Sequence, residues 1–460
     1  MSSQTPKVPV EYSAAFVGDI IITQPILQLL QRDSTDLLQI LEQADLVVGN
    51  FEGSIVDLHT FTGHPAAQSG FGWLNSPPEV AADLAGLGFH LLSRANNHST
   101  DWGHEGLRST DDHLRAAGLR VAGTGATLSA ARAPVTHDGP AARSALVSCT
   151  TTFEGDTPAE DPLGQVAGRP GASTIGLNRV ALVTPEQLEQ LRSIRDAQVA
   201  HLRPDILLLV DQLLEVVTLF DQQYAALPEG AAQVVDAIYR MDEQDLAGVL
   251  LNVRQARQTA DYVVAAVHAH EPNNWATQAP SFLRDLARQA VANGADVVVG
   301  HGPHQLRGIE WIDGRPAFYS LGNFCFMDNA QPVVTRSEWE RRIWRLSPAW
   351  TGMDPRTTTP AEFLEWQRVN GVFGESVWFE SVIPVVRYRA DGCVEQIVLR
   401  PIELRYDGRD AERGIPRVAP RDIAVRILQR LARLSEPLGT RIEIDEATGQ
   451  GVIDGITIGT

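Results

Sequence analysis

The sequence predicts an α/β fold, and two of its features support this prediction. Short apolar runs alternate with stretches of helical periodicity, both in residues 16–149 and beyond residue 260. Several apolar runs are followed at once by Asp, Glu, Asn or His, as expected where parallel strands deliver polar side chains to one edge of a sheet. The residues that follow these runs are therefore the first candidates for a functional site.

The N-terminal third reads as alternating strands and helices. Residues 1–11 are polar, contain two prolines and predict a flexible tail before a single domain that spans residues 12–460. Within residues 16–149, helical periodicity occurs at 25–31, 78–87 and 105–117, and Gly118 ends the last of these helices before an apolar run.

Two insertions interrupt this alternation. Residues from about 151 to 260 begin with a stretch rich in Gly, Pro and Thr and continue with helical spacing, which predicts a helical insertion. Residues from about 335 to 377 combine tryptophans with arginines. They predict either a helical flap packed on the core or a lid that grips a substrate. The residues concerned are Trp339, Trp344, Trp350, Trp366, Arg336, Arg341, Arg342 and Arg345.

The remaining segments return to the α/β pattern. Residues 262–267 and 296–299 predict strands joined by a helix at 279–293. After the second insertion the sequence predicts a hairpin over 382–399, a helix over 421–434 and a closing hairpin over 441–458.

Composition restricts the function. The chain has 460 residues with 43% hydrophobic content, enough for a large core. The formal net charge of -19 argues against a nucleic-acid partner or an anionic membrane surface, because both need a basic patch. The cysteines Cys149, Cys325 and Cys393 indicate no disulfide framework. With no apolar stretch of the ~20 residues that a membrane span needs, the sequence predicts a cytoplasmic protein.

Lysine is almost absent. Lys7 is the only lysine in the chain, and it lies in the predicted tail. Enzymes that use pyridoxal phosphate need a buried lysine amine. The sequence therefore predicts no pyridoxal phosphate.

The most informative run is 296–304, where an apolar strand ends in glycine and presents His301 and His304. Neutral imidazole is a common ligand of transition metals. Four more apolar runs end in polar clusters, and acidic, amide and imidazole groups brought together by five strands predict one dinuclear metal site. These clusters contain Asp19, Asn50 with Glu52, Asn96 with Asn97 and His98, and His268 with His270 and Glu271.

These motifs, taken in order, resemble the CapA family, which is named for capsule and poly-γ-glutamate synthesis and is a branch of the calcineurin-like metallophosphatase superfamily. The resemblance covers about residues 16–326 and implies a four-layer αββα sandwich with helical insertions. The motifs are Gly18-Asp19, Asn50-Phe51-Glu52, Asn96-Asn97-His98, His268, Gly300-His301-Gly302-Pro303-His304 and Ser320-Leu321-Gly322-Asn323-Phe324.

The resemblance also implies roles for the ligands. Glu52 would bridge two divalent cations, because ions ~3.5–4 Å apart need a shared anionic ligand. One metal would be held by Asp19, Glu52 and His304, and the other by Asn97, His268 and His301. Oxygen and imidazole ligands without thiolate suit Mn, Fe, Zn or Co. Asn97 as a turn residue and His268 as a core histidine remain alternatives.

Two acid/base candidates stand beside the ligands. His98 follows Asn97, and Asp101 lies three residues further on, where it can orient the imidazole. The second candidate is His270 with Glu271, in a segment where the family has glycine in place of His270. His270 is then either an additional metal ligand or a second proton carrier.

Three functions remain open for this site. The first is phosphoester hydrolysis, which is weakened because the phosphatase Asp-x-His motif is here Asp19-Ile-Ile. The second is hydrolysis or ligation of peptide or γ-glutamyl bonds, and a non-catalytic role in polymer assembly is a separate alternative. The third is inversion of an L-residue to D by proton transfer at Cα. The chain is similar to the lasso-peptide epimerases, which implies a precursor peptide as partner. The oligomeric state stays open.

Overall fold

The computed structural model describes residues 11–66, 72–199, 211–219, 222–228, 237–327, 339, 352–354, 356–370, 374–409 and 411–455. It divides into two compact units. The larger unit is formed by residues Met1–Thr174 and Ala247–Thr460, and the smaller by Ile175–Leu246. Residues 1–10 of the predicted tail lie outside the described residues.

The larger unit contains a first sheet that is built around the buried strand β1 (Tyr12–Ile21). β1 runs parallel to β2 (Leu46–Phe51) and β19 (Asn323–Phe326) and antiparallel to β20 (Glu380–Tyr388). The strand order is β23-β24-β21-β20-β1-β2-β5-β6, with β19 beside β1 and β22 beside β21. The other strands are β5 (Leu91–Ser93), β6 (Arg120–Ala122), β21 (Val394–Glu403), β22 (Arg417–Val418), β23 (Glu443–Asp445) and β24 (Gln450–Asp454).

A second sheet has the order β17-β18-β16-β15-β9-β8. Its four inner strands are parallel, and they are almost fully buried and rich in Val and Ala, as expected for strands covered on both faces. The strands are β8 (Val135–Asp138), β9 (Arg143–Thr150), β15 (Tyr262–His268), β16 (Val297–His301), β17 (Ile309–Ile312) and β18 (Arg315–Phe318).

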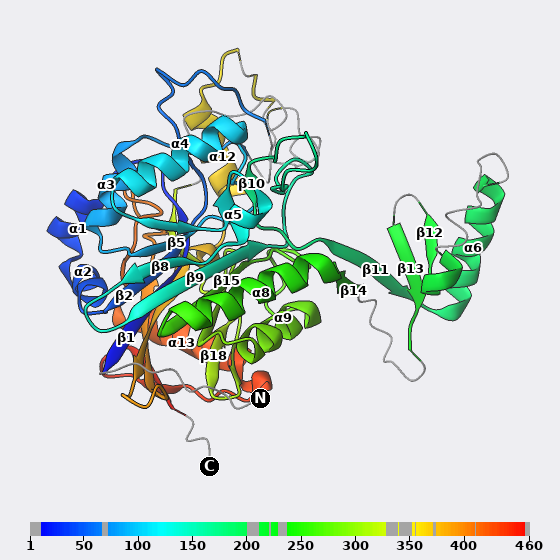
Figure 1. The fold of residues 1–460 in the computed structure, drawn as a ribbon. Helices are drawn as coiled ribbons and strands as arrows, with labels where there is room; N and C mark the ends of the chain where they lie inside the picture. The colour runs from blue at the N-terminus through cyan, green and yellow to red at the C-terminus, as the bar shows by residue number, and fades with distance from the viewer. Residues whose placement is uncertain are drawn as a thin grey trace. The chain divides into compact units, whose positions relative to one another are not determined.

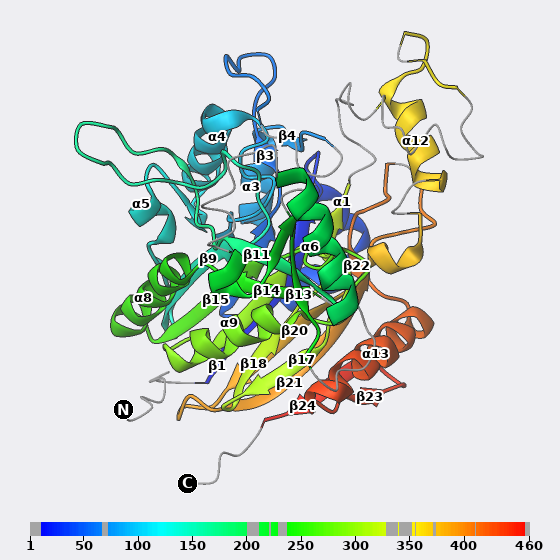
Figure 2. The ribbon, with the colours of Figure 1, turned by 90° about the vertical axis from the view of Figure 1, so that its right-hand side faces the viewer.

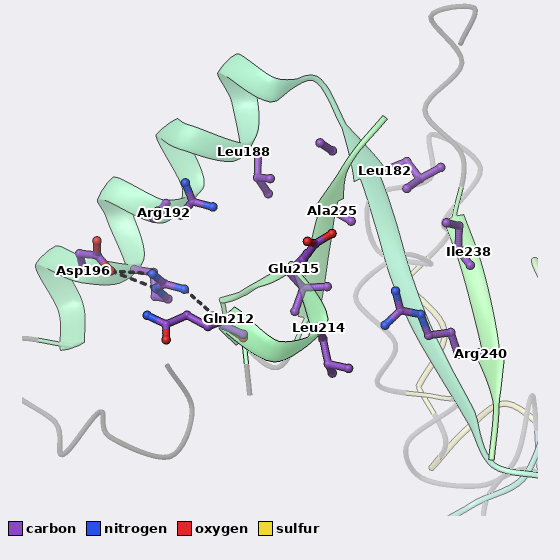
Figure 3. A pocket seen from close by; sticks show the side chains of 14 residues that line it. Leu182, Leu188, Arg192, Asp196, Gln212, Leu214, Glu215, Ala225, Ile238 and Arg240 are labelled. Atoms are coloured by element: carbon purple, nitrogen blue, oxygen red, sulfur yellow. Dashed lines mark hydrogen bonds and ion pairs between the residues drawn. The ribbon is translucent and has the colours of Figure 1, made fainter. Parts of the chain in front are cut away.

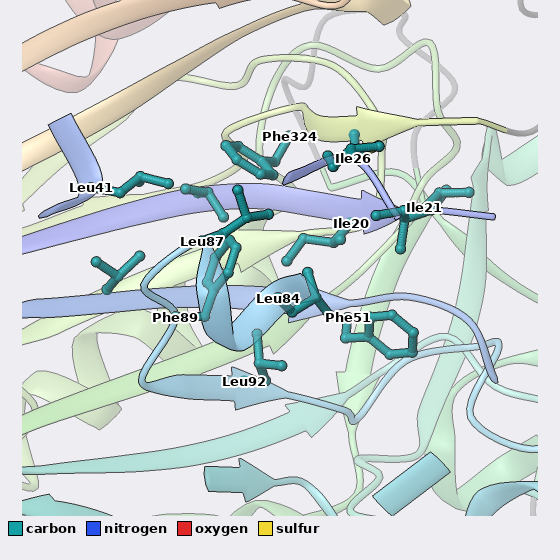
Figure 4. Close-up of a cluster of buried hydrophobic side chains, with 14 of the residues drawn as sticks. Ile20, Ile21, Ile26, Leu41, Phe51, Leu84, Leu87, Phe89, Leu92 and Phe324 are labelled. Atoms are coloured by element: carbon teal, nitrogen blue, oxygen red, sulfur yellow. The ribbon is translucent and has the colours of Figure 1, made fainter. Parts of the chain in front are cut away.

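Helices complete four layers (Figure 1). One apolar cluster joins the first sheet to α1 (Leu27–Asp33), α2 (Thr35–Glu42) and α3 (Glu79–Gly86), with Leu41, Leu84 and Phe51 among its members (Figure 4). A second apolar cluster fills the space between the two sheets. In it, Phe16 and Val48 of the first sheet pack with Val264 and Phe318 of the second.

Helices α8 (Glu243–Thr259) and α9 (Ser281–Ala292) lie over the second sheet, as Figure 1 shows. The periodic residues Phe282, Leu283 and Leu286 of α9 are buried, as expected for an amphipathic helix on a sheet. The α/β prediction and the αββα layer order are therefore confirmed.

Two further helices flank the layers. α4 (Gly103–Ala116) packs near β3 (Ser54–Ile55) and β6. α13 (Arg421–Ser435) packs along β21 and β24, as Figure 2 shows. No helix in the part of the chain that the structure describes is long and apolar enough to cross a membrane.

The smaller unit differs from the helical insertion that the sequence predicts for residues 151–260. It contains α6 (Pro185–Val199), but its sheet has four strands in the order β12-β13-β11-β14. Helical periodicity is therefore correct for α6 and α8 and wrong for the strands. Short apolar runs do not distinguish strand from helix by periodicity alone. The strands are β11 (Leu177–Val183), β12 (Val217–Leu219), β13 (Gln222–Ala226) and β14 (Ala237–Met241).

Residues 151–174 belong to the larger unit, where β10 (Gly171–Ala172) pairs with β7 (Thr124–Gly125). Part of the second insertion, about 335–377, lies outside the described residues. Within it the structure describes α12 (Pro360–Asn370), and the rings of Trp339 and Phe363 lie 4.3 Å apart. Trp366 joins the same small cluster. The choice between flap and lid stays open. The residues outside the description are Trp344, Trp350, Arg336, Arg341, Arg342 and Arg345.

Candidate metal centre

The predicted ligands come from the carboxyl ends of parallel strands in both sheets. Asp19 is paired with Asn50 across β1 and β2, and His268 is paired with His301 across β15 and β16. Gly18 allows this arrangement, because a Cβ at that position would clash with the carbonyl oxygen of Gly322. The backbone N–H of Asp19 instead donates to that oxygen at 2.9 Å.

Glu52 is the point on which the imidazoles converge. Its Oε1 atom lies 3.7 Å from Nε2 of His268 and 3.9 Å from Nε2 of both His304 and His98. Asp19 lies on the other side of two of these rings, 3.9 Å from Nδ1 of His268 and 3.6 Å from Nδ1 of His304. All of these residues are buried.

Within the described part of the chain, two groups of side chains have the geometry to hold a metal ion. One consists of Asp19, Glu52 and His268, and the other of Glu52, His270 and His304, with ligand atoms within 4.8 Å of one another in each group. Glu52 belongs to both groups, as expected of a ligand that bridges two ions.

The electrostatics of this centre fit divalent cations. Among the described residues, both carboxylate oxygens of Glu52 are buried and accept no hydrogen bond. Burial, with Asp19 and Asp101 nearby, raises the pKa of Glu52 well above its usual value. Burial also raises the pKa of Asp19, although Gly302 and Asn50 oppose the shift. A bound cation would supply positive charge beside these two carboxylates and so stabilise their ionised forms.

The histidines are held in the neutral form that binds metals. Burial lowers the pKa of His270 and of His301 to about 4. The pKa values of His268 and His304 are also lowered well below the usual value, again by burial first and then by neighbouring imidazoles. Two carboxylates and several neutral imidazoles without thiolate match Mn, Fe, Zn or Co, and the identity and number of metals stay open.

Three asparagines hold the ligands in place. Asn50 donates to Oδ1 of Asp19 at 2.8 Å, and Asn323 contacts Nδ1 of His304 at 3.0 Å. Asn274 contacts Nδ1 of His270 at 2.7 Å. Asn50 and Asn323 belong to the motifs identified from the sequence, but sequence reasoning assigned them no role. For Asn274 the sequence contains no signal, because its contact depends on the conformation of one loop.

The remaining predicted ligands, Asn97 and His301, are buried at the same strand ends. Nε2 of His301 lies 3.2 Å from the carbonyl oxygen of Val17, and its Nδ1 has no hydrogen bond within the described part of the chain. His301 is in neither group above. The division of six ligands between two metals therefore stays a prediction.

His98 and Asp101 form the pair that the sequence predicts. Nδ1 of His98 lies 2.7 Å from Oδ2 of Asp101, which also accepts the backbone N–H of Leu74 at 2.8 Å. Asp101 is buried, and burial raises its pKa although His98 opposes the shift. The carboxylate thus fixes the ring so that Nε2 faces Glu52.

His270 and Glu271 have separate environments. Nε2 of His270 lies 3.0 Å from Nε2 of His268, at the metal centre. The carboxylate of Glu271 instead accepts hydrogen bonds from the hydroxyl groups of Thr151, at 2.9 Å, and Thr152, at 3.0 Å. Glu271 therefore ties its loop to the end of β9, and an acid/base role for it stays a prediction.

A separate cavity of about 1060 Å³ lies in the smaller unit, between α6 and the four-stranded sheet (Figure 3). Leu182, Leu188 and Ile238 contribute apolar walls, and Arg192 and Arg240 contribute charge. None of the residues predicted for the metal centre lines it.

Similarity to known proteins agrees with the motifs. The chain is 38% identical over 444 residues to the uncharacterized protein y4sH of Sinorhizobium fredii, covering 95% of this chain and 92% of that protein. It is 24% identical over 333 residues to the PGA biosynthesis protein CapA of Bacillus subtilis, covering 70% and 67%.

Among solved structures, a novel phosphatase from Mycoplasma pneumoniae matches with 10% identity and a TM-score of 0.37, covering 87% of this chain and 97% of that one. At this score the match supports no statement about activity. The model of the family described as bacterial capsule synthesis protein PGA_cap matches residues 13–328. The chain with the Asp19, Glu52 and histidine centre therefore belongs to the PGA_cap family.

Proposed function

We propose that this chain is a metal-dependent peptide epimerase, which inverts an L-residue to D in a ribosomally made precursor peptide. One observation carries the proposal. His98 and His270 both direct Nε2 to the metal centre, while Asp101 and Asn274 hold their Nδ1 atoms. Divalent ions bound at the centre would act as Lewis acids toward a carbonyl oxygen of the substrate and so acidify the neighbouring Cα–H.

The two histidines come from different sheets. His98 follows β5 of the first sheet, and His270 follows β15 of the second. In inversion, a base takes the proton from Cα, and an acid delivers a proton to the opposite face of the same carbon. The covalent connectivity of the peptide and its redox state do not change. The lowered pKa of His270, about 4, leaves its imidazole neutral and able to accept a proton at Nε2, while making it a weaker base than an unperturbed histidine.

Hydrolysis is a second candidate, and a specific observation favours it. The sequence lacks the histidine of the phosphatase Asp-x-His motif, since Ile21 stands there. His270 nevertheless joins Glu52 and His304 in a metal-binding group, so it can supply the missing imidazole from another strand. His98 would then be the single acid/base residue. A role in polymer assembly, following the names of the CapA relatives, is the non-catalytic alternative.

The proposals differ in what happens to a peptide in D2O. Metal-loaded protein is incubated with L-peptides that carry a free C-terminal carboxylate, and the products are analysed by mass spectrometry. Inversion adds one mass unit at one Cα and leaves the chain intact. Hydrolysis gives fragments, or free phosphate from a phosphoester, and a purely structural protein gives neither. Fragments without deuterium at Cα would overturn the epimerase proposal.

A further inference from the structure

Trp275 is an exposed aromatic residue beside the metal centre. Its side chain is 56% exposed, although burial of a large aromatic side chain stabilises a protein. The ring meets the buried Trp378 edge-on, with centroids 5.9 Å apart and an interplanar angle of 85°. Single exposed apolar residues are common on protein surfaces, so exposure alone indicates nothing. Leu251 on α8 is also 56% exposed and lies outside the centre.

The loop that carries Trp275 is held firmly despite this exposure. The backbone N–H of Trp275 donates to Oδ1 of Asn273 at 2.9 Å. The guanidinium group of the buried Arg307 donates to the carbonyl oxygens of Glu271, at 2.8 Å, and Ala276, at 3.1 Å. These contacts fix both ends of residues 271–276, so the position of the exposed ring is set by the fold.

The two tryptophans are connected to the metal centre by two asparagines. Asn274, the neighbour of Trp275, contacts Nδ1 of His270 at 2.7 Å. Asn323 donates to the carbonyl oxygen of Trp378 at 2.9 Å and contacts Nδ1 of His304 at 3.0 Å. One asparagine therefore connects each tryptophan to a histidine, and these two histidines belong to one metal-binding group.

From these contacts we infer that Trp275, supported by Trp378, forms a binding subsite for an aromatic side chain of the peptide substrate. The inference rests on the proposed function for the peptide nature of the substrate. When an aromatic ring of the substrate packs against Trp275, water is released from the surfaces of both rings, which favours binding. Offset or edge-to-face packing of the rings adds to the binding free energy. The asparagine contacts hold the subsite in a fixed position relative to His270 and His304, so occupation places the neighbouring backbone at the metal centre.

The test measures binding and needs no catalysis. The full-length, metal-loaded protein is titrated calorimetrically with acetyl-Gly-Gly-Xaa-Gly peptides that carry Trp, Leu or Ala at Xaa. The unaltered protein should bind the Trp peptide about tenfold more tightly than the Ala peptide. Trp275→Ala should reduce this ratio to less than about twofold, whereas Trp275→Phe should retain most of it. Leu251→Ala is the matched control and should leave the ratio unchanged.

Equal affinities for the three peptides in the unaltered protein would overturn the subsite, and so would a ratio that survives in Trp275→Ala. Metal content and thermal unfolding of each variant show whether it is folded. Failure of the proposed function is distinguishable, because it removes deuterium uptake at Cα without changing the binding ratio. Failure of the subsite leaves deuterium uptake in place and removes its dependence on Xaa.

Discussion

Nδ1 of His98 lies 2.7 Å from Oδ2 of the buried Asp101, while Nε2 of the same ring lies 3.9 Å from Oε1 of Glu52. One nitrogen is thus held by a carboxylate, and the other faces the metal centre. This arrangement fixes the tautomer in which Nε2 is available to exchange a proton with a substrate. His98 belongs to neither metal-binding group, and Asp101 holds its Nδ1 atom.

Asp101→Asn should lower the rate of deuterium exchange by roughly 10²–10⁴-fold, because the amide no longer fixes the orientation and tautomer of His98. Metal content should stay near that of the unaltered protein. Asp83→Asn serves as control, since Asp83 is a buried carboxylate that accepts backbone N–H groups of Ile26 and Leu27 outside the centre. Equal loss of activity in both variants would show that Asp101 acts only on stability.

Glu52→Ala should remove most of the bound metal, because Glu52 is the ligand shared by both groups. Metal content measured by plasma mass spectrometry is the readout. The fold should persist, since the two apolar clusters do not depend on the metal. Retention of the full metal content in Glu52→Ala would contradict the bridging role.

His270→Ala distinguishes a metal ligand from a proton carrier. If His270 serves as the second acid/base residue, metal content should change little and net inversion should fall by roughly 10²–10⁴-fold. If it replaces the imidazole missing from the Asp-x-His motif, metal content should fall, and hydrolysis becomes the better reading. Metal analysis of the purified variant decides between the two.

Metal binding should become tighter as the pH rises. In the metal-free protein, burial raises the pKa of Asp19 and of Glu52, so their protonated forms are favoured. The stability of the folded, metal-free protein therefore falls as the pH rises through these raised pKa values. The lowered pKa values of His268 and His304 have the opposite effect on stability. The folded protein disfavours protonation of these imidazoles, so it loses stability as the pH falls. A cation needs carboxylates without protons, so the raised pKa values of Asp19 and Glu52 make binding tighter at higher pH, whereas His268 and His304 are already neutral and compete little with protons.

The increase in unfolding temperature on adding metal should therefore be larger at about pH 8 than at about pH 5, and binding near neutral pH should release protons. Differential scanning fluorimetry and calorimetry in buffers of different ionisation enthalpy measure these two quantities. Asp19→Asn should reduce the proton release. An equal increase in unfolding temperature at both pH values would show that Asp19 and Glu52 do not exchange protons for metal.

The sequence places the side chains of the centre at one sheet edge because they follow apolar strands, and their role as metal ligands stays a prediction. Asp19 lies near the carboxyl end of the buried strand β1, and His268 ends the buried strand β15, so local pattern is sufficient to place them at a sheet edge. The contact of Asn274 with His270 and the strand β11 of the smaller unit were missed. The first depends on a loop held by Arg307, and the second on pairing with β13 and β14, so neither is encoded by local periodicity.

The most direct test of proton transfer by His98 is deuterium uptake into L- and D-configured forms of one substrate peptide by the unaltered protein and by His98→Ala, with metal content measured in parallel. The unaltered protein should incorporate deuterium into both forms. His98→Ala should lose net inversion by roughly 10²–10⁴-fold with metal content unchanged. Full inversion by His98→Ala, or no deuterium uptake by the metal-loaded unaltered protein with any peptide, would contradict proton transfer by His98.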